Sequence, residues 1–288
     1  MGIGLVLEGG AMRGMFTAGV LDVMMENGIR LDAAVGVSAG AVFGCNYKSH
    51  QPGRAIRYNK AYCRDKRYCS LASWLRTGDL YNVEFGYHTL VWKLDRFDRA
   101  AFAADPMPFW AVCTDAETGK PVYHLCEKGD EEDVEWLRAS ASMPLAARPV
   151  DIRGQKLLDG GVSDSIPLKF MESEGYARNV AVLTQPEGFK KRKNRLIPWV
   201  RLLLRRYPMV ARRLKTRHVE YNAALRSVAE READGRLFVI RPPERLRVGA
   251  AERDPDRLER VYQTGRREME KRLEELKAFI RENSRNPA

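Results

Sequence analysis

The sequence predicts an α/β domain that carries a helical C-terminal extension. Two apolar runs of strand length are each followed by a glycine-rich turn and then by a segment whose apolar residues have helical spacing. That alternation of strand and helix is typical of α/β domains. The chain has 288 residues, which suits one such domain with an appendage. From Pro255 onward an apolar stripe with helical spacing predicts the extension, and Asp254 is placed to cap it.

The first glycine motif is Gly9-Gly10-Ala11-Met12-Arg13-Gly14, and it follows a predicted strand at residues 3–7. A predicted helix over residues 13–27 comes next, because its apolar residues recur with helical spacing. Gly28 is suited to end this helix as its C-cap. A strand-to-helix turn of this kind exposes several backbone N–H groups. Such groups can hold either a phosphate or the oxyanion of a tetrahedral intermediate.

These two uses of the glycine turn differ in what they require of the sequence. A dinucleotide site needs a middle glycine where this chain has Ala11, although Asp32 lies near the position of the usual acidic residue. The nucleotide interpretation also leaves Ser38 and Asp159 without a role. We therefore favour the oxyanion interpretation.

The second motif, Gly36-Val37-Ser38-Ala39-Gly40, also lies between a strand and a helix. Residues 31–37 predict a buried strand and residues 39–43 predict a helix start, so Ser38 occupies a sharp turn between them. Side chains two positions to either side of such a nucleophile elbow would collide. Gly36 and Gly40 remove that clash and leave the Ser38 hydroxyl exposed. The helix directs the positive end of its dipole at the reacting centre.

The third motif is Asp159-Gly160-Gly161, which taken singly is also compatible with an ordinary turn. An aspartate can deprotonate a serine directly if burial raises its pKa and it lies within about 3 Å of the hydroxyl. The two glycines permit that approach. None of the four histidines lies in a motif that suggests a general base; they are His50, His88, His124 and His218.

In this order the three motifs resemble those of patatin-like phospholipases. The sequence around Asp159 adds to the resemblance, with matching stretches at residues 139–144, 149–150 and 166–168. The resemblance covers roughly residues 1–185 and implies a three-layer α/β/α sandwich with a mostly parallel central sheet. Residues 186–288 would then form a basic segment and a helical extension packed on the same body.

The resemblance also implies a set of site residues. Ser38 would be the nucleophile and Asp159 the base of a Ser-Asp dyad that works through an acyl-enzyme. Arg13 would face a substrate phosphate or stabilise its loop. The oxyanion hole would come from the backbone of Gly9, Gly10 and Ala11, and the further motif glycines are Gly14, Gly36, Gly40, Gly160 and Gly161.

Ala11 is a departure from the family pattern, because it replaces the usual third glycine. If the loop needs a positive φ there, the hole would be strained or displaced. We therefore carry two functions forward. The first is a serine lipid acyl hydrolase that cleaves carboxylic esters of phospholipids, lysophospholipids or related lipids. The second is a catalytically weak lipid-binding or membrane-surface protein on the same fold. Neither requires a metal or another cofactor.

The net charge of +11 is concentrated in one segment. Residues 189–217 hold twelve cations and no acid, interleaved with apolar residues that include Trp199. The stretch from Lys190 to Arg217 therefore suits an anionic membrane surface, with a tryptophan at headgroup level. A solvated helix face that covers the core is an equally open interpretation. No nucleic-acid partner is expected, because no binding motif accompanies the charge. The sequence leaves the oligomeric state open.

The remaining segments are predicted more coarsely. Residues 53–104 are rich in aromatics and predict helices and loops that cap the site. Further strands are expected at residues 107–114, 121–125, 180–183 and 237–240. The five cysteines are odd in number and have no zinc spacing, which indicates reduced thiols. With no leader or span expected, we place the protein in the cytoplasm or peripherally on the inner face of a membrane.

Overall fold

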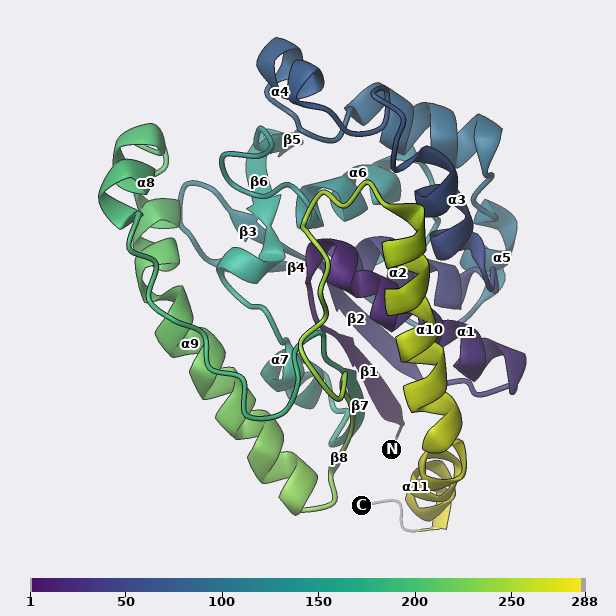
Figure 1. Ribbon diagram of the computed structural model, residues 1–288. Coiled ribbons are helices and arrows are strands. Elements are labelled where there is room, and N and C mark those ends of the chain that lie inside the picture. The colour runs from purple at the N-terminus through teal and green to yellow at the C-terminus, as the bar shows by residue number, and fades with distance from the viewer. Residues whose placement is uncertain (1, 286–288) are drawn as a thin grey trace.

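The fold is built around one eight-stranded sheet (Figure 1). The computed structural model describes residues 2–285. The strands are β1 Ile3–Leu7, β2 Ala33–Val37, β3 Phe109–Asp115, β4 Pro121–Cys126, β5 Val150–Ile152, β6 Gln155–Asp159, β7 Arg178–Val182 and β8 Leu237–Ile240. Their order across the sheet is β5-β6-β3-β2-β1-β7-β8, and β4 pairs with β3 outside this path.

Helices form the rest of the regular structure. The α-helices are α1 Gly14–Glu26, α2 Ala39–Lys48, α3 Arg54–Tyr62, α4 Leu71–Thr77, α5 Arg99–Ala104, α6 Glu131–Ser140, α7 Leu168–Ser173, α8 Ile197–Leu203, α9 Pro208–Ala233, α10 Pro255–Lys271 and α11 Leu273–Arg285. Two short 3₁₀ helices are η1 Ala11–Arg13 and η3 Gly160–Val162, and η2 Glu84–Leu94 is a π-helix. Across residues 2–285, none of the helices combines the length and apolar character that a bilayer span needs.

The sheet is parallel over the five strands β3, β2, β1, β7 and β8, and antiparallel where β4, β5 and β6 join it. Every residue of β1 and of β2 is buried. Strands that are covered on both faces are expected to be continuously apolar, and these two are. The predicted α/β fold class with a mostly parallel sheet is thereby confirmed.

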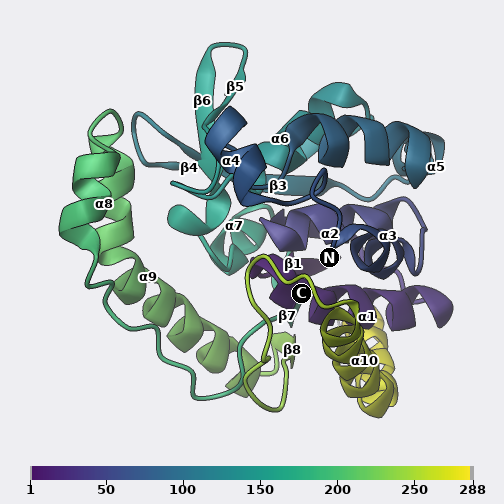
Figure 2. The same cartoon turned by 45° about the horizontal axis from the view of Figure 1, so that its top comes forward.

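Helices cover both faces of the sheet, as Figure 2 shows most clearly. Because side chains alternate along a strand, Leu5 and Leu7 of β1 face one layer and Val6 faces the other. The first layer contains buried residues of α1, α2, α3 and α10, among them Phe16 and Leu258. The second contains buried residues of α7 and α9, and these are Leu168, Met171, Tyr221 and Val228.

The C-terminal part of the chain joins both the sheet and a helical layer. Strand β8 pairs in parallel with β7 and extends the sheet at that edge. Helix α10 packs on α1, and the crossing is so close that a Cβ on Gly265 would lie 2.0 Å from the carbonyl oxygen of Phe16. The part of the predicted apolar stripe that lies in α10 therefore faces α1. The single helix predicted from Pro255 is divided, since α10 ends at Lys271 and α11 begins at Leu273. The predicted domain boundary at residue 185 stays a prediction.

Two features of the fold were not predicted from the sequence. One is the antiparallel hairpin of β5 and β6, whose strands of three and five residues are weak sequence signals. The other is the π-helix η2, which lies within the aromatic residues 53–104. π-Helices are rare and cluster at functional sites, and η2 lines the cavity described below.

Candidate active site

Ser38 lies at the turn between β2 and α2, in the strained conformation expected for a nucleophile elbow. Its φ is 54° and its ψ is −122°, a combination that is costly for a residue with a side chain. Both flanking glycines are required by close packing. A Cβ on Gly36 would lie 2.6 Å from the backbone nitrogen of Ala41, and one on Gly40 would lie 2.5 Å from the carbonyl oxygen of Leu7.

Ser140, at the end of α6, holds the elbow in place. Its hydroxyl accepts a hydrogen bond from the Ser38 amide at 2.9 Å and donates one to the Val112 carbonyl at 2.6 Å. The side chain is fully buried. Ser140 therefore ties the Ser38 backbone to strand β3. The sequence analysis quoted the stretch around Ser140 but did not assign this role, because nothing in a single serine reveals a partner 102 positions away.

Asp159 ends strand β6 and is brought to Ser38 by the pairing of β6 with β3. Its backbone is held from both sides, because its amide donates to the Ser142 carbonyl and its carbonyl accepts from the Thr114 hydroxyl, each at 2.8 Å. Gly160 lets the chain pass: a Cβ there would lie 2.1 Å from the Val112 carbonyl oxygen. The third motif is thus a constrained junction between strand and helix.

The Asp159 carboxyl group is buried, and three neighbouring groups act on its pKa. Burial raises its pKa, while a hydrogen bond from the Ser38 side chain, the positive charge of Arg217 and the amide of Gly161 act in the opposite direction. The Gly161 amide donates to Oδ1 at 2.7 Å. An aspartate with a raised pKa therefore lies near the elbow serine, which is an arrangement suited to proton transfer.

The first glycine motif lies against the same serine. A Cβ on Gly9 would lie 3.0 Å from the Ser38 Cβ. Within the part of the chain that the structure describes, the amides of Gly10 and Ala11 donate to no protein acceptor. Ala11 has a φ of 48°, so the position that departs from the family pattern does adopt a left-handed backbone. The loop is therefore strained, and two of its backbone amides are free to bind a ligand.

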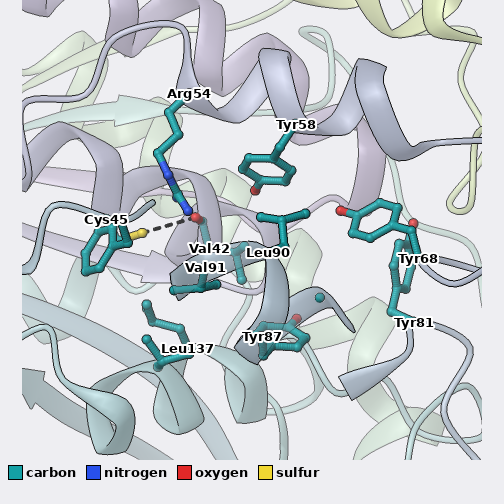
Figure 3. Close-up of a pocket in the computed structure, with 13 residues that line it drawn as sticks. Val42, Cys45, Arg54, Tyr58, Tyr68, Tyr81, Tyr87, Leu90, Val91 and Leu137 are labelled. Atoms are coloured by element: carbon teal, nitrogen blue, oxygen red, sulfur yellow. Dashed lines mark hydrogen bonds between the residues drawn. The ribbon is translucent and has the colours of Figure 1, made fainter. Parts of the chain in front are cut away.

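A mostly apolar cavity of about 890 Å³ opens beside Ser38. A second cavity, of about 580 Å³, shares four of its lining residues and continues away from the serine; these are Val42, Tyr68, Tyr81 and Tyr87. Figure 3 shows the second cavity, with Tyr58 and Tyr68 on one side and Tyr87 and Leu137 on the other. The aromatic residues of 53–104 therefore line the space next to the elbow.

Glu8 directly precedes the glycine loop and anchors it. The sequence analysis did not identify this residue. It is buried, and its carboxylate accepts hydrogen bonds from the Thr184 amide at 2.6 Å and from the Tyr221 hydroxyl at 2.5 Å. Burial raises its pKa, against the effect of these bonds and of the Arg13 charge. The sequence signal that could have identified Glu8 is its position, since it is a charged residue at the end of an apolar strand and directly before the glycines.

Other candidate residues lie apart from the elbow. Asp32 accepts the Ile3 amide at 2.6 Å, at the end of β1 opposite to the glycine loop. His124 stacks on Trp136 with ring centroids 4.1 Å apart. Within residues 2–285, no histidine forms a hydrogen bond or ion pair with Ser38 or Asp159.

The basic segment has an inner side and an outer side. Helix α8 packs through Ile197 and Val200, which are buried. Its outer face leaves four large apolar side chains mostly exposed, and these are Leu196, Trp199, Leu202 and Leu203. Arg217 of α9, by contrast, points toward the site, since its Nη2 lies 3.5 Å from the Ser165 hydroxyl.

The family follows from comparison with known proteins. A family model described as "Patatin-like phospholipase" matches residues 5–171, which is more than half of the chain. The protein therefore belongs to the patatin-like phospholipase family, and the resemblance drawn from its motifs is confirmed. A second model, "Domain of unknown function (DUF6363)", matches residues 207–281.

Several named proteins are similar to this chain. The "Uncharacterized protein YjjU" of Escherichia coli is 32% identical over 188 residues, which are 64% of this chain and 52% of that protein. "Lysophospholipase NTE1" of Candida albicans is 30% identical over 194 residues, 62% of this chain and 13% of that protein. The chain thus spans about half the length of the first relative and far less of the second. The crystal structure of VipD from Legionella pneumophila superposes with a TM-score of 0.47 at 12% identity, over 95% of this chain and 67% of that one.

Proposed function

We propose that the protein is a serine lipid acyl hydrolase in which Ser38 and Asp159 form a catalytic dyad. The observation that carries this proposal is the placement of a buried aspartate near the elbow serine: burial raises the pKa of Asp159, and the Ser38 side chain acts in the opposite direction. Family membership and the similarity to lysophospholipases support ester hydrolysis of lipids in general terms.

The chemistry can be written from these residues alone. Ser38 Oγ attacks the ester carbonyl while its proton passes to the Asp159 carboxylate, and the alcohol leaves with that proton. The oxyanion that forms accepts hydrogen bonds from the free amides of Gly10 and Ala11. Water, deprotonated by Asp159, then releases the fatty acid and restores Ser38. The mostly apolar cavity beside the serine takes the acyl chain.

A membrane surface is the proposed location of the substrate. The outer face of α8 combines exposed Trp199 and leucines with neighbouring cations, which suits an anionic bilayer. Met143, which lines the cavity, is also partly exposed, and Leu71 and Leu75 of α4 are further exposed apolar side chains. The solvated-face interpretation of the segment predicts no affinity for lipid.

A fluorophosphonate probe tests the nucleophile directly. We expect stoichiometric labelling of the folded protein at Ser38, and loss of both labelling and p-nitrophenyl butyrate hydrolysis in Ser38→Ala with a nearly unchanged melting temperature. Hydrolysis that persists in this variant would remove Ser38 as nucleophile. Absence of labelling in the wild type would favour the alternative, a lipid-binding protein without catalysis.

Vesicle sedimentation tests the membrane surface. We expect binding to phosphatidylglycerol vesicles to weaken as salt exceeds about 0.15 M, because charges are then screened within about 8 Å. Trp199→Ala should weaken binding at every salt concentration, since its contribution is burial in the interface. Hydrolysis of a soluble ester should be unaffected. If neither salt nor Trp199→Ala alters vesicle binding, α8 is a solvated surface helix.

A further inference from the structure

Three metal-ligating side chains of different types meet where strand β4 contacts helix α6. Donor atoms of His124, Cys126 and Asp133 all lie within 4.8 Å of one another. His124 and Cys126 are two positions apart on β4, so their side chains leave the same face of the strand. Asp133 lies in the first turn of α6. A search for paired cysteines in the sequence does not detect this set, because only one of its members is a cysteine.

Two of the three side chains are oriented by neighbours outside the cluster. The His124 ring stacks on the Trp136 ring of α6, with centroids 4.1 Å apart and planes 5° apart. The Asp133 Oδ2 accepts hydrogen bonds from the amides of Lys128 at 2.8 Å and Gly129 at 2.7 Å. The other oxygen, Oδ1, is the one that lies near His124. Outer contacts of this kind orient the ligands of known metal sites.

The spacing of the donor atoms fits tetrahedral metal coordination. The His124 Nε2 lies 3.3 Å from the Asp133 Oδ1, just beyond the usual range of about 2.7–3.2 Å for an N–H···O hydrogen bond. Bonds of about 2.0–2.3 Å to a tetrahedral zinc ion place its donors about 3.3–3.8 Å apart. Movements of about 1 Å would therefore bring all three donors to this spacing. The His124 side chain is 25% exposed, which leaves a path for an ion from solvent.

The charges around the cluster allow a divalent cation. Lys48 lies close enough for the charges of Asp133 and Glu127 to act on its ammonium group. That ammonium group is already held by two backbone carbonyls, and the Lys48 and Glu127 charges have opposite signs. A divalent ion bound by an ionised thiol, a carboxylate and a neutral imidazole gives a site with no net charge.

We propose that His124, Cys126 and Asp133 form a zinc site that ties strand β4 to helix α6. A thiolate, an imidazole and a carboxylate together suit Zn²⁺, whereas Mg²⁺ and Ca²⁺ take oxygen ligands. Water takes the fourth position, and the proton of the Cys126 thiol passes to solvent when the ion binds.

The site is separate from the dyad and braces the helix that supports the elbow. Asp133 lies near the start of α6, and Ser140, which accepts the Ser38 amide, lies at its end. Seven residues of helix separate the two by about 10 Å. Strand β4 lies outside the main path of the sheet and pairs with β3. A bound ion would fasten this strand to α6 and so stabilise the fold.

Titration of the reduced, chelator-treated protein with Zn²⁺ and Co²⁺ tests the site. We expect one equivalent of Zn²⁺ to bind in competition with a chromogenic chelator. Co²⁺ should give the visible absorption of a tetrahedral complex and a thiolate-to-cobalt charge-transfer band, and Zn²⁺ should displace both. A hundredfold excess of Zn²⁺ over its Kd should raise the melting temperature by about 5 °C. Failure to bind one equivalent, or a cobalt complex without the thiolate band, would overturn the proposal.

Three conservative variants locate the ligands. His124→Phe keeps a ring to stack on Trp136, Asp133→Asn keeps an oxygen to accept the two amides, and Cys126→Ala removes the thiol. Each should weaken Zn²⁺ binding by more than the roughly ten- to hundredfold that loss of an outer contact costs. Cys126→Ala should also abolish the charge-transfer band. Zn²⁺ affinity equal to that of the wild type in these variants would contradict the assignment.

Two further variants serve as controls. Cys63 is a buried thiol outside the cluster, and its Sγ donates to the Arg253 carbonyl at 3.4 Å. Cys63→Ala should bind Zn²⁺ as the wild type does, and equal losses in Cys63→Ala and Cys126→Ala would show unspecific thiol binding instead of a site. Ser38→Ala should also bind normally, because the zinc site does not depend on the proposed hydrolase; loss of Zn²⁺ binding there would contradict a separate site. Circular dichroism of each variant checks that the fold is retained.

Discussion

The two parts of the chain divide the site between them. The region matched by the family model supplies the strained elbow, the aspartate and the glycine loop, all held by short backbone contacts. The region after residue 185 supplies charge: Arg217 acts on the Asp159 carboxyl group, Lys191 lies over the Tyr221 ring, and α8 carries exposed apolar side chains among cations. We propose that the first part carries out the reaction and that the second influences where it occurs.

Close backbone packing at glycines joins the two parts, and the same kind of packing forms the elbow. At the elbow Gly36 and Gly40 meet neighbouring backbone, and at the joint Gly19 and Gly265 let α1 and α10 cross. A buried carboxylate, Asp22, adds a polar contact there. Helix α10 is therefore packed on α1 as closely as the elbow is packed on its neighbours.

The largest expected effect concerns the chemistry of the first part. Asp159→Asn should lower kcat/KM for a soluble ester by roughly 10³- to 10⁴-fold, because the amide cannot accept the serine proton. The double variant with Ser38→Ala should be no worse than either single one, since the two residues act as a unit. Because burial raises the pKa of Asp159 in the folded protein, the Asn variant should not be less stable than the wild type near neutral pH. Additive losses would show that the two residues act independently.

The joint between the parts should be the next most sensitive place. A Cβ on Gly265 would lie 2.0 Å from the Phe16 carbonyl oxygen. Because this clash is with backbone, no side chain can move to relieve it, and the helices themselves would have to shift. We expect Gly265→Ala to lower the free energy of unfolding by about 3 kcal/mol, measured with urea. Gly249→Ala is the matched control, because its Cβ would meet only a Glu252 oxygen at 3.9 Å. Equal effects would mean that α10 is loosely packed.

Asp22 at the same joint should make stability depend on pH. Its Oδ2 accepts the Gly53 amide at 2.9 Å and the Tyr262 hydroxyl at 2.8 Å, and burial raises its pKa to about 6. A raised folded pKa gives stability that is present below about pH 4 and is lost as pH rises through about 6.

Asp22→Asn keeps an acceptor oxygen and cannot ionise. The stability of this variant relative to wild type should therefore increase by about 2 to 3 kcal/mol between about pH 4 and pH 8. Urea unfolding at several pH values measures the difference. A constant difference across that range would show that Asp22 does not hold its proton in the folded state.

The smallest expected effect concerns the loop strain. Ala11 has a φ of 48°, which costs about 1 to 2 kcal/mol for a residue with a Cβ. A glycine there also makes the unfolded chain more flexible, so Ala11→Gly should stabilise the protein by only about 0.5 kcal/mol. The same change in an ordinary helical position, Ala103→Gly in α5, should destabilise it by about 1 kcal/mol. Destabilisation in both would mean that the loop is unstrained.

Much of the fold around the elbow could be predicted because its sequence signals are local. The first strand, the elbow and the helix after it are marked by apolar spacing and glycines within short stretches of sequence, and the motifs report them directly. The hairpin of β5 and β6 gave no comparable signal, since its strands are short and gain their stability from pairing with β3. The break before α11 was missed for a similar reason, because the apolar stripe continues through it.

The sequence by itself determined the order of strand, turn and helix, the strained serine and the aspartate that could serve it, because apolar spacing and glycine positions report strands, helices and tight turns locally. Tertiary structure alone decided which cations face Asp159 and which face solvent. Lys191 and Arg217 belong to one uninterrupted basic segment in the sequence, and no local property separates them from Lys190 or Arg212. Their direction is set by Asn222 and by the packing of α9 on the sheet, contacts that exist only when the chain is folded.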